Sequence, residues 1–174
     1  MKVTKDMLDP GLQSIYGPLK IFPFILTRKW GINLVNFQAR FTKGKNIKGL
    51  ECEERFIPSK NGDPPIRIRI FRPLNHSGKL PAMVYYHSGG LMIGTPEMSL
   101  DIIRQFIEKR PCVVIVPDYR KAMESPFPAA FNDCYDTLLW AKENADELGI
   151  LPGKFIVAGH SAGGGLAAAV TLKA

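Results

Sequence analysis

After roughly residue 50, short apolar runs alternate with stretches whose apolar residues recur at helical spacing. The runs predict β-strands, which we expect near Cys52–Ile57, Ile66–Phe71, Ala82–Tyr86, Val113–Val116 and Phe155–Ala158. Helices are expected at Ser99–Lys109, at Phe131–Leu148 and from Ala162 onward. Helices that alternate with apolar strands predict an α/β fold, with a mostly parallel sheet and helices on both of its faces.

The helix expected at Phe131–Leu148 has the clearest pattern. Apolar residues recur every three or four positions from just before it to its end, at Phe127, Ala130, Cys134, Leu138, Ala141, Ala145 and Leu148. Gly149 then fits a C-terminal cap, and Pro152 prevents the helix from resuming. The pattern predicts a long helix with one apolar face.

The pentapeptide Gly159-His160-Ser161-Ala162-Gly163 joins the last expected strand to the last expected helix. A Gly-x-Ser-x-Gly sequence in this context is typical of a nucleophile elbow, a strained turn that exposes the serine hydroxyl. The two outer glycines would relieve contacts between elements that approach closely. The Ala162 N–H would lie at a helix N-terminus, where unpaired donors favour negative charge. The alternative is a glycine-rich helix start with an exposed serine.

A second signal follows the strand expected at Ala82–Tyr86, which ends in His87-Ser88-Gly89-Gly90. Glycines directly after a strand let backbone N–H groups turn toward a ligand, as the oxyanion of a tetrahedral acyl intermediate requires. Gly89, Gly90 and Ala162 would then point three N–H groups at one oxygen. An ordinary tight turn is the alternative, but two such signals in this order favour an oxyanion hole.

These stretches resemble the hormone-sensitive-lipase-like esterases of the α/β-hydrolase fold, also called bacterial family IV esterases. Two further stretches match the family, Asp118-Tyr119-Arg120 and Glu124-Ser125-Pro126-Phe127-Pro128-Ala129-Ala130. The resemblance covers about residues 50–174, the first half of a family catalytic domain. It implies serine-dependent hydrolysis of carboxylic esters without a cofactor or a metal. The implied site has Ser161 as nucleophile, Gly89, Gly90 and Ala162 as the oxyanion hole, and His87 and Ser88 in the oxyanion-loop motif.

Four positions depart from the family pattern. Ser88 replaces the first glycine of the oxyanion loop, Lys121 and Met123 interrupt the usual Leu-Ala-Pro, and Gly165 stands where asparagine is common. Ser88 leaves the implied oxyanion donors in place, because these belong to the two glycines that follow it. The changes at 121 and 123 bear on the substrate-side loop more than on the chemistry.

A serine nucleophile needs a base that is oriented by a carboxylate, and the chain has three histidines. We expect His76 in a solvated turn, His160 packed beside the serine, and His87 bracing the oxyanion loop. In the family the acid and the histidine follow the serine, and those positions do not exist among these 174 residues. The last helix also reaches Ala174 without a cap. The sequence therefore predicts a fold truncated after this helix, and a chain that is inactive alone.

Two hypotheses remain open. The chain is either the N-terminal part of a serine carboxylesterase, whose missing C-terminal half is supplied in cis or by a partner chain, or a catalytically dead ligand-binding or interaction protein of the same fold. An intact Ser161 between its glycines favours the first, because a binding protein does not need that strained turn.

The formal net charge of +7 lies in the first fifty residues, which hold nine Lys/Arg against two Asp and several aromatic residues. We assign residues 1–48 to a basic, aromatic, cap-like segment and residues 49–174 to the hydrolase-like domain. The segment is expected to lie over the mouth of the active site, with peripheral contact to a membrane or lipid as the alternative. No nucleic-acid motif accompanies the charge, so a nucleic-acid partner is not expected.

Cys52, Cys112 and Cys134 are odd in number and lack metal-type spacing, so we expect reduced thiols, with Cys134 in the core. The first six residues are not followed by the apolar region of a secretory signal, and Ile21–Leu26 is too short to span a bilayer. We therefore expect a cytoplasmic protein whose small-molecule partner is an ester substrate.

Overall fold

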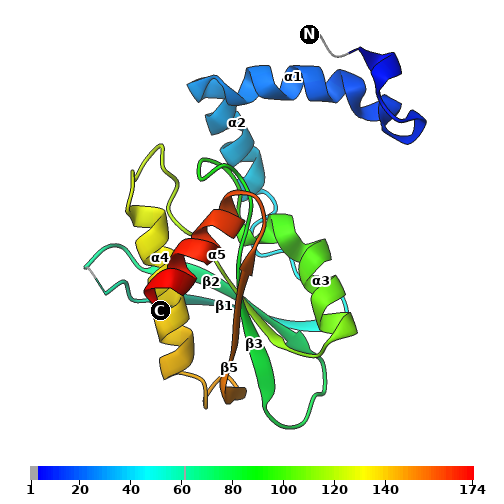
Figure 1. Cartoon of the computed structure of the whole chain (residues 1–174). Helices are drawn as coiled ribbons and strands as arrows, with labels where there is room; N and C mark the ends of the chain where they lie inside the picture. Colours follow the sequence, from blue (N-terminus) through cyan, green and yellow to red (C-terminus); the bar gives the residue numbers. More distant parts are fainter. Residues whose placement is uncertain (1–3, 61) are drawn as a thin grey trace. The chain divides into compact units, whose positions relative to one another are not determined.

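The computed structural model describes residues 4–60 and 62–174, so the start of the segment considered for a secretory leader, residues 1–3, lies outside it. The chain divides into two compact units, Met1–Gln38 and Ala39–Ala174. Two short 3-10 helices, η1 (Lys5–Met7) and η2 (Pro10–Ile15), precede α1 (Tyr16–Leu26) and α2 (Lys29–Arg40) (Figure 1). Within the described ranges no helix is both long enough and apolar enough to cross a membrane.

The second unit is built on a five-stranded sheet in the order β1-β2-β4-β3-β5. The strands are β1 (Leu50–Ile57), β2 (Ile66–Pro73), β3 (Leu80–Tyr86), β4 (Val113–Pro117) and β5 (Ile150–Gly159). β2 pairs antiparallel with both β1 and β4, whereas β3 runs parallel to both β4 and β5. The expected mostly parallel sheet is therefore mixed. A short loop joins β1 to β2, and strands connected in this way pair antiparallel.

Three helices cover the two faces of this sheet (Figure 1). α3 (Leu100–Lys109), which follows the short helix η3 (Pro96–Ser99), lies on one face. α4 (Ala129–Glu143) and α5 (Ala162–Lys173) lie on the other. The expectation of an α/β fold with helices on both faces is confirmed. β5 forms one edge of the sheet, and its Ile156 side chain is 56% exposed.

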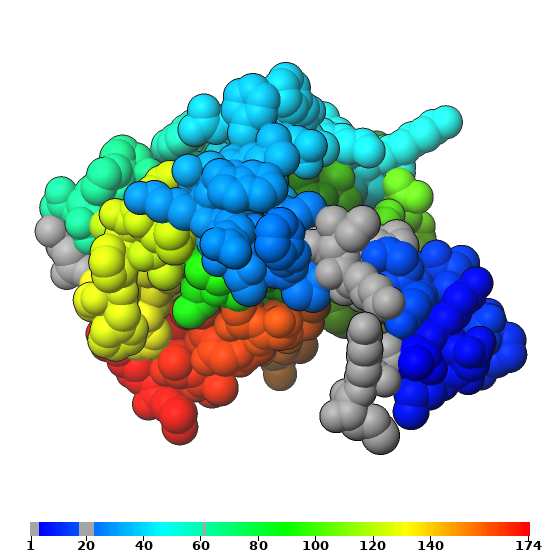
Figure 2. All heavy atoms as spheres, turned by 90° about the horizontal axis from the view of Figure 1, so that it is seen from above, coloured from blue at the N-terminus to red at the C-terminus, as the bar shows by residue number. Residues whose placement is uncertain are grey.

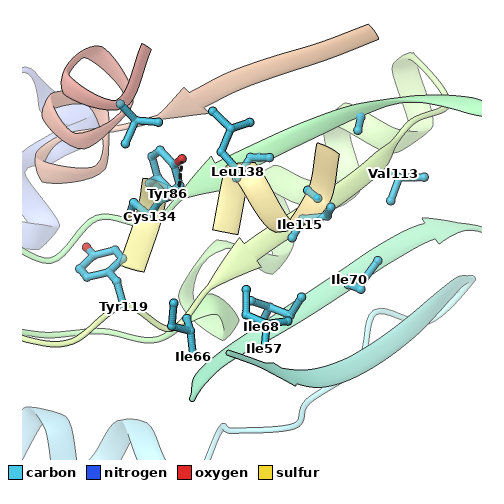
Figure 3. Packing of buried hydrophobic residues seen from close by; sticks show 14 of the residues in the cluster. Ile57, Ile66, Ile68, Ile70, Tyr86, Val113, Ile115, Tyr119, Cys134 and Leu138 are labelled. Atoms are coloured by element: carbon cyan, nitrogen blue, oxygen red, sulfur yellow. Dashed lines mark hydrogen bonds between the residues drawn. The ribbon is translucent and has the colours of Figure 1, made fainter. Parts of the chain in front are cut away.

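Successive residues of the strands pack in two separate hydrophobic cores, because their side chains point to opposite faces of the sheet. Toward α4 and α5, Tyr86 packs with Ile115, and its hydroxyl donates a hydrogen bond of 2.9 Å to the carbonyl of Cys134 (Figure 3). Toward α3, Tyr85 packs in a second cluster with Ile103. The C-terminal end of β3, which is followed by His87-Ser88-Gly89-Gly90, is therefore packed on both faces of the sheet.

α4 ends at Glu143 rather than at the expected Leu148. Asn144 stops it, because its side-chain amide donates a hydrogen bond of 2.8 Å to the carbonyl of Trp140 and so caps the last turn. Leu148 is nevertheless buried in the core. Phe127, expected to continue the apolar face of this helix, precedes the helix and is 88% exposed.

β5 begins at Ile150, earlier than the expected Phe155. Ile150 pairs with Leu80 and Phe155 pairs with Ala82, so residues 151–154 bulge out of the ladder. Gly153, within the bulge, has a φ of +69°, a backbone conformation that glycine adopts readily. Residues 151–154 are therefore a bulge inside a strand that is longer than expected.

Residues 39–48, the end of the expected N-terminal segment, make described contacts within the second unit. Ile47 is 2% exposed and belongs to the cluster on the α3 face. The Gly44 N–H donates to a carboxylate oxygen of Glu97 at 2.9 Å, and the side chain of Asn46 accepts a hydrogen bond of 2.7 Å from Arg69. The second unit thus includes this stretch.

Candidate active site

Ser161 lies at the sharp turn between β5 and α5, in the place that the sequence motif predicts. Its backbone has φ 54° and ψ −127°, a conformation that is strained for a residue with a side chain. The residue is exposed to solvent. Backbone strain of this kind persists only where the surrounding structure enforces it. Here the close packing at Gly159 and Gly163 does so.

Gly159 and Gly163 let the turn pack against itself and against the end of β3. A Cβ atom on Gly163 would lie 2.0 Å from the carbonyl oxygen of Tyr86 and 2.7 Å from that of His87. A Cβ atom on Gly159 would lie 2.4 Å from the Gly163 carbonyl oxygen. Since neither position has room for a side chain, the motif glycines bring Ser161 next to the loop that follows β3.

Hydrogen bonds to two carbonyl groups fix the peptide planes of that loop. The oxygen of Ser88 accepts a bond of 2.6 Å from Nδ1 of His87, and the oxygen of Gly89 accepts bonds of 3.0 Å from the N–H groups of Met92 and Ile93. In a trans peptide the C=O and the following N–H point in opposite directions. The N–H groups of Gly89 and Gly90 therefore point away from the groups that hold the loop.

Gly89 is required by this loop for a second reason. Its φ is +132°, and a Cβ atom there would lie 1.9 Å from the carbonyl oxygen of Ile93. Gly90, with φ +60°, has a freer environment, because the nearest atom to a Cβ would be the terminal methyl group of Met92 at 3.9 Å.

Ala162 is the first residue of α5, and the orientation of its N–H follows from the same rule. The carbonyl of Ser161 accepts hydrogen bonds of 2.9 Å from Gly164 and 3.3 Å from Gly165, so it points along the helix. The Ala162 N–H then points out of the helix N-terminus, where the dipole favours an anion. Among the described residues, no hydrogen bond uses the N–H of Gly89 or Gly90 as its donor. These donors remain available to a ligand.

The His87 side chain is completely buried and stacks on the ring of Tyr119, with ring centroids 4.2 Å apart. Because the Ser88 carbonyl can only accept, Nδ1 of His87 carries the hydrogen and Nε2 is a bare acceptor. Nε2 is buried and has no hydrogen-bond partner in the described part of the chain. Burial, and then the nearby ammonium group of Lys121, lower the pKa of His87 to about 3. His87 is thus a neutral brace for the loop, as its position in the sequence suggested.

The other two histidines also lie in structural surroundings. Nδ1 of His160 shares a hydrogen bond of 2.5 Å with the hydroxyl of Tyr85, which ties the elbow to β3. His76 lies in the turn between β2 and β3 and is exposed. Across residues 4–60 and 62–174, no hydrogen bond joins the Ser161 hydroxyl to an imidazole group.

The segment 118–122 braces the glycine loop from outside it, a role that was not predicted from the sequence. The hydroxyl of Tyr119 donates a hydrogen bond of 2.8 Å to the His87 carbonyl, and the N–H of Ala122 donates one of 2.8 Å to the Leu91 carbonyl. Tyr119 belongs to a matched family stretch, but a motif gives no indication of the partner that its hydroxyl meets. The contact depends on tertiary structure, because the pairing of β3 with β4 brings Tyr119 to the His87 carbonyl.

A buried group of charges lies behind the loop, where Glu97 of η3 faces two arginines of β2. An oxygen of Glu97 lies 2.5 Å from Arg67 and 3.0 Å from Arg69. Burial alone would raise the pKa of Glu97, but hydrogen bonds from Arg67 and from the Gly44 N–H outweigh it and lower the pKa to about 2. Arg67 also lies 3.2 Å from Asp118, so the cluster reaches the segment that braces the loop.

An apolar pocket of about 400 Å³ opens beside the first turns of α5. Ala162 lines it together with Leu91 and Ala122 from the loop side and Phe131 and Leu166 from α4 and α5. In Figure 2 green atoms of the middle of the chain lie between the yellow atoms of the α4 region and the orange to red atoms of α5. Apolar surface is therefore available next to the candidate donor Ala162.

Comparison with known proteins identifies the family of this fold. A family model described as the alpha/beta hydrolase fold matches residues 83–174, which include both glycine motifs. The chain belongs to the α/β-hydrolase fold family. The resemblance to esterases drawn from the sequence is confirmed by relatives that are named as esterases.

The chain is 33% identical over 168 residues to Carboxylesterase NlhH of Mycobacterium tuberculosis, an alignment that covers 95% of this chain and 51% of that protein. It is 38% identical over 122 residues to an arylesterase of Saccharolobus solfataricus, covering 70% of this chain and 40% of the relative. Among solved structures, a bacterial heroin esterase superposes with a TM-score of 0.79 at 33% identity, covering 98% of this chain and 54% of that one. The chain spans about half the length of these relatives.

Proposed function

We propose that this α/β-hydrolase contributes the nucleophile and the oxyanion hole to the hydrolysis of carboxylic esters. The observation that carries the proposal is the strained Ser161 beside the unoccupied N–H groups of Gly89 and Gly90. The relatives named carboxylesterase and arylesterase support ester hydrolysis as the reaction class.

In the proposed reaction the Ser161 oxygen attacks the ester carbonyl carbon while a base takes the hydroxyl proton. The carbonyl oxygen becomes an oxyanion, which the N–H groups of Gly89, Gly90 and Ala162 stabilise. The tetrahedral intermediate collapses to an acyl-serine, and the alkoxide leaves with the proton held by the base. A water molecule then gives a proton to the base and attacks the acyl-serine through a second oxyanion; the bond between the acyl carbon and the serine oxygen breaks, the acid is released, and Ser161 regains its proton from the base.

We propose that the base and its orienting acid come from outside these 174 residues, either in cis or from a partner chain. His87 is held by the loop and His160 by Tyr85, which leaves neither free to serve the serine. The edge strand β5, next to the elbow, offers unpaired backbone groups to further chain.

The 174-residue chain assayed alone on p-nitrophenyl acetate or butyrate is therefore expected to show little or no turnover. The coding sequence beyond Ala174 is the companion observation: an acidic residue and a later histidine in frame support the enzyme. Turnover by the chain alone at the rate of a full-length relative, abolished by Ser161→Ala, would contradict the proposed absence of a base.

A catalytically inactive ligand-binding protein is the second candidate. The apolar pocket beside Ala162 is the observation that favours it, since a pocket binds without a base. The substitution Ser161→Ala separates the functions of the two candidates. It should leave the binding of an uncharged ester analogue to the pocket unchanged, whereas it should abolish acyl transfer.

For the basic N-terminal segment we propose a cap over the active-site mouth, with peripheral lipid contact as the competing role. The side chains of Phe24, Trp30 and Phe41 are more than half exposed, so aromatic surface is available for either role. Co-sedimentation with anionic and neutral liposomes, with and without residues 1–48, separates them. Binding that requires both anionic lipid and the segment supports lipid contact.

A further inference from the structure

Two hydrogen bonds from one short segment hold the two ends of the loop that carries the proposed oxyanion donors. The Tyr119 hydroxyl binds the carbonyl of His87, and the Ala122 N–H binds the carbonyl of Leu91, each at 2.8 Å. The donor glycines 89 and 90 lie between these two anchors. The orientation of these two donor N–H groups therefore depends on the conformation of the segment 118–122.

Lys121 lies between the two anchoring residues and folds back onto its own segment. Its ammonium group donates hydrogen bonds to the carbonyl of Tyr119 and, at 3.1 Å, to a carboxylate oxygen of Asp118. The same ammonium lies 4.4 Å from the centroid of the Tyr119 ring, in cation–π geometry. Only 13% of the Lys121 side chain is exposed, so these contacts form largely out of water.

Asp118, the acid that receives Lys121, is itself immobilised. Arg67 and Lys43 lie 3.2 Å and 2.7 Å from its other oxygen, and its N–H donates a hydrogen bond of 2.8 Å to the Arg67 carbonyl on β2. A buried ammonium paired with a fixed carboxylate gains more from its position than one paired with a mobile surface acid. Lys121 thus connects the loop brace to the sheet.

We propose that Lys121 is a positioning residue of the oxyanion loop: its ammonium group, anchored on Asp118, holds Tyr119 and Ala122 where they hydrogen-bond the two ends of the loop. The catalytic consequence rests on the function proposed above, whereas the structural consequence does not.

The aromatic and imidazole rings transmit this constraint. The Tyr119 ring has the Lys121 ammonium near it and also stacks on His87 at an interplanar angle of 8°. Displacing the Lys121 ammonium removes a contact on the Tyr119 ring. The Tyr119 ring is then no longer held parallel to the His87 imidazole. Because Nδ1 of His87 orients the Ser88 carbonyl, the Gly89 N–H would lose its fixed direction as well.

The test is amide hydrogen exchange of the ¹⁵N-labelled protein in Lys121→Met, with Lys43→Met as the matched control. Both substitutions remove an ammonium group that contacts Asp118, but only Lys121 lies in the segment 118–122 that holds the loop. We expect the Ala122 amide to exchange about tenfold faster in Lys121→Met, while amides of β3 and β4 keep their rates. Lys43→Met should leave the Ala122 rate unchanged.

Two results would overturn the proposal: an unchanged Ala122 rate in Lys121→Met, or an equal acceleration of the β3 and β4 amides, which indicates general destabilisation. Lys121→Gln replaces Lys121→Met if the latter does not fold. In the protein expressed from its complete coding sequence, Lys121→Met should lower kcat for p-nitrophenyl butyrate with KM unchanged. If the wild type hydrolyses no ester, the proposed function fails while the exchange experiment still decides the role of Lys121.

Discussion

The carbonyl oxygen of Tyr86 occupies the space that a side chain on Gly163 would need, at 2.0 Å from its Cβ position. This contact joins the last residue of β3 to the first turn of α5. It places the serine turn and the glycine loop side by side, which is the arrangement that the proposed chemistry requires.

Replacing Gly163 by alanine should therefore destabilise the fold strongly, because one of two backbone segments must move. Gly165→Ala is the matched control in the same helix, since a Cβ atom there has no neighbour within 4 Å. At that helical position alanine is expected to stabilise by up to about 1 kcal/mol. Thermal unfolding of both variants is the measurement, and similar melting temperatures would refute the close approach.

Gly89→Ala should impair ester hydrolysis more than Gly90→Ala. The first substitution brings a Cβ atom to 1.9 Å from the Ile93 carbonyl oxygen at φ +132°, whereas the second meets only a flexible methyl group at 3.9 Å. A displaced oxyanion donor lowers kcat by about 10²- to 10³-fold. The comparison uses kcat for p-nitrophenyl butyrate in the complete protein. Equal losses in the two variants would argue against Gly89 as the constrained donor.

Glu97 should make the protein sensitive to acid. Its pKa in the folded protein is about 2, below the ordinary value of 4.5, so its ion pairs stabilise the fold above pH 4.5 and are lost as the pH falls toward 2. Glu97→Gln leaves Arg69 without its acid and leaves Arg67 with only Glu54 and Asp118, and it should lower the free energy of unfolding by about 3–5 kcal/mol at pH 7.

Urea unfolding at pH 7 and at pH 3 measures this effect, with Asp146→Asn as control. Asp146 pairs with Lys79 on the surface, where its side chain is 87% exposed, so its loss should change little. A Glu97→Gln variant as stable as the wild type at pH 7 would show that the buried cluster does not hold η3.

His87 should remain neutral across the physiological range. With a folded pKa of about 3 against 6.5 in the unfolded chain, its buried neutral ring stabilises the fold above pH 6.5, and this contribution declines as the pH falls from 6.5 toward 3. Its NMR signals should not titrate between pH 8 and 5. A titration midpoint near pH 6 would mean that the ring is not buried as described.

The sequence predicted those parts of the site that local chemistry encodes. Ser161 and Gly163 lie in a turn that depends on residues adjacent in the sequence, and Gly89 lies in the short motif that follows β3, so their places could be predicted from the sequence. Helices on both faces followed from the alternation of apolar runs.

Features that depend on tertiary partners were not predictable in this way. Arg67 alternates with isoleucines on β2, a pattern typical of a strand with a solvated face, yet it is buried because Glu97 comes from a distant helix to meet it. The helix end at Asn144 was missed because a side-chain hydrogen bond outweighed apolar spacing that continued to Leu148. The bracing hydroxyl of Tyr119 has a backbone carbonyl as its partner, which no sequence pattern marks.

The central claim is that Ser161 is the nucleophile, and the most direct test is the intact mass of the protein after reaction with an alkyl fluorophosphonate. The protein is expressed from its complete coding sequence and compared with Ser161→Ala, and the labelled peptide is located by fragmentation. We predict one phosphonyl group on Ser161 and none in the variant. A wild type that stays unlabelled, or a label that persists in Ser161→Ala, would contradict the account.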